Sequence, residues 1–150
     1  MPAPDVFLLA MLVLLACATV AGGVYEYVVI DPAWPTCPAI IQPAQGGVSR
    51  RRFWIPIHSA FEVVLVVAVI VTWSVPDVRD ALFVAFISHT VMRVWSLAEF
   101  VPKAVAFENA DPAAIDADAA VRWTRRSLLR LPLDGVTVAA AFVALLMAVS

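Results

Sequence analysis

Four long apolar segments make up most of this 150-residue chain, and ionisable side chains lie within or at the rim of them. A helix needs about 20 mostly apolar residues to cross the hydrocarbon of a bilayer, so each segment is long enough for one span. Hydrophobic residues are 63% of the chain and charged residues 15%, against about 45–50% and about 25% in an average soluble domain. The sequence therefore predicts an all-α, polytopic membrane four-helix bundle in a single domain. The expected spans are residues 6–30, 53–75, 81–101 and 128–149.

Basic residues are concentrated in the two connections that lie between spans one and two and between spans three and four. They are Arg50, Arg51, Arg52, Lys103, Arg122, Arg125, Arg126 and Arg130. On the opposite side the only basic residue is Arg79. Because Lys and Arg favour the cytoplasmic side of membrane proteins, we expect a plasma (inner) membrane location, with both termini outside and both long connections in the cytoplasm.

The two connections differ in character. Residues 31–52 hold several prolines and the pair Gly46-Gly47, so we expect an irregular loop, which carries Trp34 and folds over the mouth of the bundle. In the second connection, Asp111 precedes a proline, as an N-cap often does. This predicts a cytoplasmic helix over residues 112–130 that leads into the last span. No basic residue precedes the first span, and we expect that span to be retained rather than cleaved as a signal peptide.

Ionisable groups inside a bilayer usually face the interior of a bundle and indicate a functional site. His58 and Glu62 are four residues apart, as are His89 and Arg93, so each pair lies on one helix face. A rise of about 1.5 Å per residue places Glu62 and Arg93 at one depth and His89 deepest. The depths predict a Glu62–Arg93 ion pair, with either a structural or a ligand-anchoring role. Glu26 shares a level with His58, which makes these two a candidate acid–base pair at the cytoplasmic mouth.

These positions define a polar pocket in the cytoplasmic half of the bundle. The candidate catalytic residues are Glu26, His58, Glu62 and His89. The candidate substrate-binding residues are Tyr25, Arg93, Trp95, Glu99, Arg130 and Asp134, of which the last three have a structural role at the rim as the alternative. Four tryptophans near span ends are expected to be interfacial anchors, namely Trp34, Trp54, Trp73 and Trp123. Cys17 and Cys37 are expected to be buried thiols, because their spacing fits neither a redox pair nor a metal site.

No metal or other cofactor is favoured by these patterns. The estimated depths of His58 and His89 differ by about 12 Å, which is too far for a shared haem iron. The Glu-x-x-His spacing of di-metal bundles is absent from the sequence. If a metal does bind, its ligands would come from His58, Glu62, His89 and Glu26. The net charge of −2 argues against a nucleic-acid partner.

Two short motifs are similar to those of the anthrone-oxygenase-like family of small four-span membrane proteins. One is Gly22-Gly23-Val24-Tyr25 leading to Asp31-Pro32-Ala33, and the other runs from Trp123 to Arg130 ahead of an alanine-rich last span. The resemblance implies the four-span plan and an oxygenation of polycyclic aromatic substrates without an evident cofactor. It assigns no role to the His58-x-x-x-Glu62 or His89-x-x-x-Arg93 pairs.

The expected function is therefore that of a membrane enzyme, oxygenase-like or acid–base, that acts on a lipophilic small molecule in contact with the bilayer. Two alternatives come from other classes of protein. The chain could be a non-enzymatic membrane subunit or lipophile-binding module, or a proton-coupled carrier, which the lack of inverted repeats disfavours. A homo-oligomer is compatible with Gly22-Gly23, since small residues let membrane helices approach closely.

Overall fold

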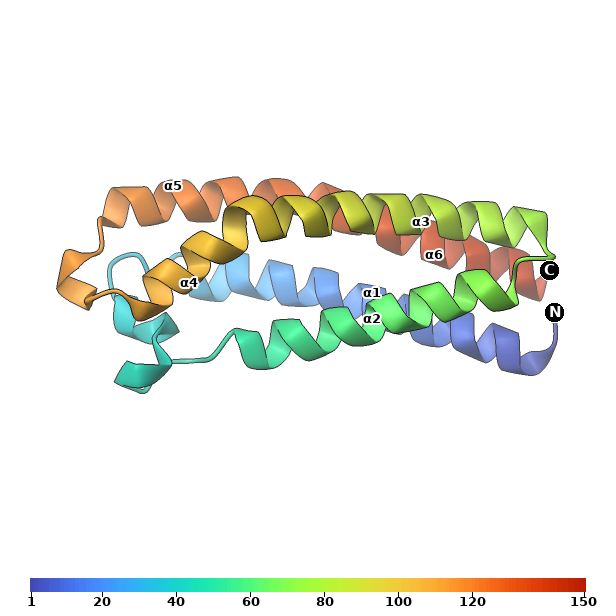
Figure 1. Ribbon diagram of the computed structural model, residues 1–150, viewed down its shortest axis with the longest axis horizontal. Coiled ribbons are helices and arrows are strands. Elements are labelled where there is room, and N and C mark those ends of the chain that lie inside the picture. The colour runs from blue at the N-terminus through green and yellow to red at the C-terminus, as the bar shows by residue number, and fades with distance from the viewer.

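The fold is a bundle of four long helical rods, seen in a computed structural model that describes residues 1–150, with the side chains of residues 3 and 4 left out (Figure 1). The described residues contain helices and loops and no strand. The principal helices are α1 (Ala3–Tyr25), α2 (Arg51–Val71), α3 (Pro76–Trp95), α4 (Val101–Asn109), α5 (Ala117–Ser127) and α6 (Leu131–Val149). Four stretches are long and apolar enough to cross a membrane, namely Asp5–Ile30, Arg51–Val71, Pro76–Asn109 and Ala117–Val149. The predicted all-α, multi-pass architecture is confirmed.

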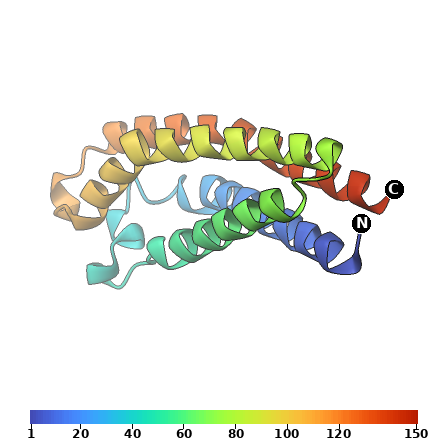
Figure 2. The same cartoon turned by 45° about the vertical axis from the view of Figure 1, so that its right-hand side comes forward.

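The two ends of the bundle differ in what they carry. Both termini lie at one end, and the long connections lie at the other (Figure 1). We name these the terminal end and the loop end. Toward the loop end, α2 diverges from α3 (Figure 2). The bundle is therefore narrow at the terminal end and wide at the loop end.

The second half of the chain departs from the expected boundaries. The third rod continues past residue 101 through α4, and the helix that leads into the last rod begins at Ala117 rather than residue 112. Asp111 caps only a 3-10 turn, Pro112–Ala114. The N-cap of α5 is Asp116, whose carboxylate accepts hydrogen bonds from two backbone N–H groups. A side chain that satisfies two otherwise unpaired N–H groups is the stronger helix start, which explains why α5 begins there.

Apolar packing fills the terminal end. The core joins Leu9 and Leu12 of α1, Phe61 and Leu65 of α2, and Leu82 of α3, each at most 1% exposed. Alanines of α6 close this core, namely Ala140, Ala141, Ala144 and Ala148. Small side chains let membrane helices approach closely, so α6 packs tightly against its neighbours.

The loop between α1 and α2 folds over the loop end, as predicted. It is irregular apart from two 3-10 turns, Pro38–Ile41 and Pro43–Gln45. Trp34 is fully buried, and its ring centroid lies 5.1 Å from that of Phe107 and 6.0 Å from that of Trp123. The expected role of Trp34 and Trp123 as interfacial anchors is therefore wrong, because both indoles pack in an aromatic cluster beneath the loop.

Two further expectations concern α1. Gly22 and Gly23 leave room for neighbouring side chains, since an added Cβ at Gly22 would clash with the Phe53 ring and one at Gly23 would lie 2.8 Å from Leu131. The expectation that the two cysteines are buried is wrong, because Cys17 and Cys37 are both exposed. Cys17 lies on the outer face of α1, where a small apolar thiol faces away from the core.

Candidate functional site

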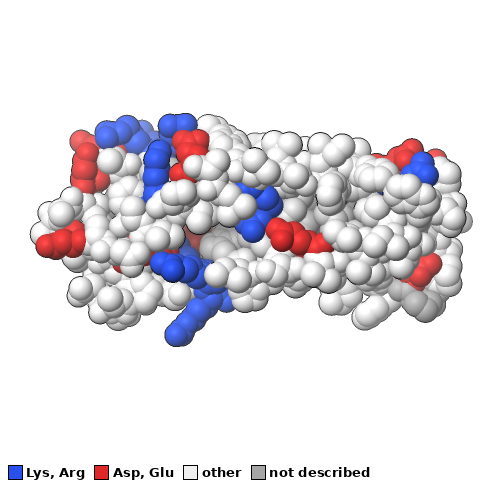
Figure 3. Space-filling model, in the orientation of Figure 1, with Lys and Arg blue, Asp and Glu red and all other residues white. Residues whose placement is uncertain are grey.

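A cavity of about 390 Å³ lies between the diverging rods at the loop end. Small-molecule sites usually have volumes of about 300–1,000 Å³, so the cavity is large enough for a ligand. Ile55 of α2 and Leu97 and Val101 of the third rod line it and are exposed on the outside. The cavity therefore opens sideways between α2 and the third rod. Figure 3 shows this face, hollowed near the middle of its length with charged side chains around the hollow.

Two π-helical turns border the cavity, and neither was expected from the sequence. One is Glu26–Ile30 at the end of the first rod, and the other is Ser96–Phe100 between α3 and α4. A π-helical turn carries an extra residue and is frequent at functional sites. Here the two turns supply Glu26 and Tyr27 from one side and Ser96 and Phe100 from the other. No residue type indicates such a turn reliably, so sequence patterns miss it.

His58 lines the cavity with a ring that is almost fully enclosed. The residue is 8% exposed, and its ring stacks on the Trp54 indole with a centroid distance of 5.3 Å and an interplanar angle of 20°. Nδ1 is buried and has no hydrogen-bond partner. Among the described residues, none bonds to Nε2 either. His58 is therefore a candidate reactive group whose Nε2 is the ring nitrogen that remains accessible.

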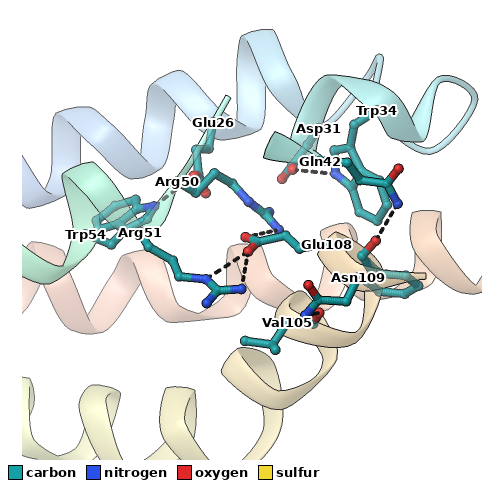
Figure 4. Close-up of polar contacts among 11 residues, drawn as sticks. Glu26, Asp31, Trp34, Gln42, Arg50, Arg51, Trp54, Val105, Glu108 and Asn109 are labelled. Atoms are coloured by element: carbon teal, nitrogen blue, oxygen red, sulfur yellow. Dashed lines mark hydrogen bonds and ion pairs between the residues drawn. The ribbon is translucent and has the colours of Figure 1, made fainter. Parts of the chain in front are cut away.

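The expected Glu26–His58 pair is replaced by a three-residue arrangement. Trp54 Nε1 donates a hydrogen bond of 2.7 Å to Glu26 Oε1 (Figure 4). The same indole stacks on the His58 ring. No direct Glu26–His58 hydrogen bond exists in the described part of the chain. Trp54 was expected to be an interfacial anchor, but it belongs to the site. The reason is that an indole placed between the two side chains can bond one and stack on the other.

The predicted Glu62–Arg93 ion pair is confirmed. Arg93 Nε donates to Glu62 Oε1 at 2.7 Å, and His89 Nε2 lies 3.4 Å from the same oxygen. Arg93 lines the cavity, whereas Glu62 and His89 do not. The Glu62 side chain is 43% exposed, so the pair lies toward the outer face of the bundle rather than at its centre. Glu62 and His89 thus hold Arg93 in place from outside the cavity.

The estimated separation of the two histidines is wrong. The His58 and His89 ring centroids lie 5.8 Å apart, whereas axial rise suggested about 12 Å. Depths of Cα atoms along parallel axes do not locate the ends of long side chains, and the helices diverge rather than run parallel (Figure 2). Within the described residues, no three His, Cys, Asp or Glu side chains are grouped so that they could hold a metal ion.

Arg130 and Asp134 both line the cavity, as expected of substrate-binding residues. Arg130 Nη1 donates to Ser96 Oγ at 3.0 Å, Nε donates to the Ser127 carbonyl at 3.1 Å, and its guanidinium lies 4.5 Å from the centroid of the Phe100 ring. These contacts fix the guanidinium against the third rod. Arg130 makes no ion pair with any described residue.

Three other expected site residues lie outside the cavity, namely Tyr25, Trp95 and Glu99. Tyr25 is 58% exposed. Trp95 Nε1 donates to Glu99 Oε2 at 2.8 Å, and Glu99 also pairs with Arg126 at 2.6 Å. Trp95 and Glu99 therefore bond each other and Arg126 on a side of the third rod that does not line the cavity.

A buried charge cluster closes the loop end of the cavity. Glu108, which is 7% exposed, accepts from Arg51 Nη2 at 2.8 Å and from Arg50 Nη2 at 3.5 Å (Figure 4). Gln42 donates to the Phe107 and Ala110 carbonyls, tying the loop to the end of α4. Sequence reasoning missed Glu108, because the third span was expected to end at residue 101.

Asp31 lies at the same end of the cavity, just past the first rod. Its Oδ1 accepts a hydrogen bond from Trp34 Nε1 at 3.1 Å. Burial, together with the negative charge of Glu26, raises the pKa of Asp31 to about 6 from its ordinary value of 3.8. The Asp31 carboxyl therefore gains or loses its proton close to neutral pH.

Comparisons with known proteins add no relative, since the chain matches no family model, no curated protein and no solved structure.

Proposed function

We propose that this chain is a membrane enzyme that performs acid–base chemistry on a lipophilic small molecule bound in the cavity. The observation that carries the proposal is the placement of His58. Its imidazole lies in the wall of a largely apolar cavity, and no carboxylate among the described residues bonds to it. A neutral histidine can donate a hydrogen bond to a substrate oxygen on which negative charge develops when a nearby base removes a proton.

The surroundings of His58 favour one tautomer. A proton on Nδ1 would be a buried donor without an acceptor, which costs about 1–3 kcal/mol. The neutral ring therefore carries its proton on Nε2 and presents an N–H donor to the cavity. In this form His58 hydrogen-bonds a substrate oxygen and stabilises negative charge that develops on it. The role of base falls to Glu26, which Trp54 holds through one carboxylate oxygen, leaving the other oxygen for the proton that the substrate loses.

The resemblance to anthrone oxygenases supports a polycyclic aromatic substrate with a weakly acidic methylene group in the same ring as its carbonyl. In this reaction Glu26 takes a methylene proton, and His58 stabilises the resulting enolate oxygen. The enolate then reacts with molecular oxygen, which is the oxidant. Anthrone and O₂ give anthraquinone and one water, so the methylene carbon is oxidised to a carbonyl. One atom of O₂ becomes the new carbonyl oxygen and the other leaves in the water.

A lipophile-binding module is the second candidate, and one observation favours it. Glu62 and His89 lie outside the cavity and contact each other, which suits a role in helix packing rather than in chemistry. Binding without turnover would be the signature of this alternative.

The experiment measures hydrogen–deuterium exchange at the methylene of anthrone under anaerobic conditions, with purified protein in lipid nanodiscs. We expect the protein to accelerate exchange, and His58→Phe, which keeps a ring to stack on Trp54, to lose about 100-fold of that rate. Tyr25→Phe is the matched control, because Tyr25 lies outside the cavity, and it should exchange at the rate of the unmodified protein.

Admitting oxygen then tests the second step through O₂ uptake and anthraquinone absorbance. Exchange that is unaffected by His58→Phe would overturn the assigned site. Saturable anthrone binding with neither exchange nor oxygen uptake would replace the enzyme by the binding module. Absence of binding in both the protein and the Tyr25→Phe control would reject the lipophilic aromatic substrate.

The proposal includes the orientation in the inner membrane, with the loop end in the cytoplasm. The bias of basic residues toward that end supports it. In a Cys17→Ser variant, Cys37 in the loop is the remaining cysteine. A membrane-impermeant maleimide should label it only after the cells are permeabilised, and labelling of intact cells would reverse the orientation.

A further inference from the structure

Arg130 has hydrogen-bonding capacity that no described residue uses. A guanidinium carries five N–H donors. Its hydrogen bonds to the Ser127 carbonyl and to Ser96 Oγ use one donor on Nε and one on Nη1. The Phe100 ring covers one face of the Arg130 guanidinium plane. Because one face is covered and two nitrogens are already held, the free edge of the guanidinium, which includes Nη2, is what remains for a ligand in the cavity.

Asp134 presents the complementary acceptor. It follows Arg130 by four residues, which places both on one side of the last rod, and both line the cavity. Their charged atoms are not within 4.0 Å of each other, and in the described part of the chain the Asp134 carboxylate accepts no hydrogen bond. The Arg130 donor and the Asp134 acceptor thus face the same cavity without bonding to each other.

Resting on the proposed function, we infer that this part of the cavity recognises a hydroxyl group of the lipophilic ligand, which accepts from Arg130 and donates to Asp134. A hydroxyl is the small group that can do both at once. An ether oxygen can only accept, so it would leave the Asp134 carboxylate without a donor, and unpaired buried polar groups are strongly selected against in binding.

The other charges in the cavity argue against an anionic group in the same place. Glu26 and Asp31 also line the cavity and add negative charge near Arg130. Arg50 is already bonded to Glu108, and Arg93 to Glu62. An anionic carboxylate on the ligand would therefore compete for Arg130 against three acidic side chains, whereas a neutral hydroxyl satisfies both Arg130 and Asp134.

The test compares three naphthalene ligands that differ in one group, namely 2-naphthol, 2-methoxynaphthalene and 2-naphthoate. Equilibrium dialysis against nanodiscs with and without protein gives their dissociation constants at pH 7. We expect 2-naphthol to bind at least about tenfold more tightly than either analogue. Asp134→Asn should weaken 2-naphthol and strengthen 2-naphthoate, because it removes the acceptor charge that excludes an anion. Asp77→Asn, an exposed carboxyl at the start of α3, is the matched control and should leave all three constants unchanged.

Two results would overturn the inference. Equal affinity for 2-naphthol and 2-methoxynaphthalene would show that no hydroxyl is recognised. Tightest binding of 2-naphthoate by the unmodified protein would make Arg130 an anion site instead. Neither result bears on His58-dependent exchange of anthrone, so failure of the hydroxyl preference and failure of the enzyme proposal are separate outcomes. Thermal unfolding of each variant in the same nanodiscs confirms that a lost preference is not a lost fold.

Discussion

The two ends of this bundle are built from the same four rods but differ in what fills the space between them. At the terminal end, Leu12, Leu65 and Leu82 pack against the alanines of α6 and leave no charged group inside the core. At the loop end the rods separate, and the interior is held by arginines, carboxylates and indoles around a cavity. In lipid there is little hydrophobic drive between helices, so close packing must hold the terminal end, while specific polar contacts must hold the loop end. The comparison teaches that the scaffold and the site are separate regions of one bundle.

Removing the central carboxylate of the loop end should have the largest effect. Glu108→Gln leaves Arg50, which is 9% exposed, without a counter-charge, and breaking a buried ion pair costs about 3 kcal/mol. SDS-unfolding titrations should show this loss of unfolding free energy. Arg122→Gln is the matched control, because its pair with Asp116 is exposed, and it should change stability by less than about 0.5 kcal/mol. Equal effects of the two substitutions would remove the distinction between buried and exposed charge at this end.

Overfilling the terminal end should come next. Ala144 is fully buried against the neighbouring helices, so Ala144→Leu should destabilise the bundle by about 2 kcal/mol in the same titration. Ala139→Leu on the exposed side of α6 is the control and should be nearly neutral. Ligand affinity should stay constant in both variants, since neither position lines the cavity. A change of affinity in Ala144→Leu would mean that the two ends are coupled.

The Glu62–Arg93 pair lies where the two ends meet, and a double-mutant cycle measures its strength. With Glu62→Gln and Arg93→Gln, we expect an interaction free energy of about 1–2 kcal/mol, since bonded charges at 2.7 Å couple. The value should be larger in nanodiscs than in detergent, because water screens a half-exposed pair. Additive substitutions would show that the ion pair does not connect α2 to α3.

The smallest effect should come from Asp31 and should depend on pH. The folded-state pKa of Asp31, about 6, lies above its ordinary value of 3.8. The contribution of Asp31 to the free energy of unfolding is therefore greatest below about pH 4 and falls as the pH rises through 6. Asp31→Asn keeps an oxygen for the Trp34 indole and removes this loss. We expect the variant to be more stable by about 1 kcal/mol at pH 7.5, after allowing for solvent screening, and equal to the unmodified protein at pH 4. A constant difference across this range would exclude Asp31 as its source.

The sequence predicts the scaffold better than the site. Apolar length identifies four rods, and the four-residue spacing of His89 and Arg93 identifies the face that meets Glu62. Prediction fails where the backbone leaves α-helical geometry. The depth of each side chain and the helix face on which it lies both follow from the rise and turn angle of an α-helix. The two π-helical turns, Glu26–Ile30 and Ser96–Phe100, border the cavity, and no local pattern predicts them.

Tryptophan is the second cause of failure. Trp54 and Trp123 lie near the ends of the expected spans, where interfacial anchors are common. In the structure Trp54 bonds Glu26, and Trp123 packs beneath the loop. An indole combines an apolar body with one donor, so it suits an interface and a binding site equally. Only tertiary contacts, which no local pattern encodes, decide between the two.

The π-helical turn at Ser96–Phe100 absorbs one extra residue within a single turn of the third rod. Deleting the exposed residue Ala98 would let this turn become an ordinary α-helical turn, and the helix on either side would keep its facing. Glu108 would then still reach Arg50 and Arg51. A one-residue deletion within α4 itself would instead rotate Glu108 by about 100° relative to α3, so the third rod tolerates a change of length at this turn and not beyond it.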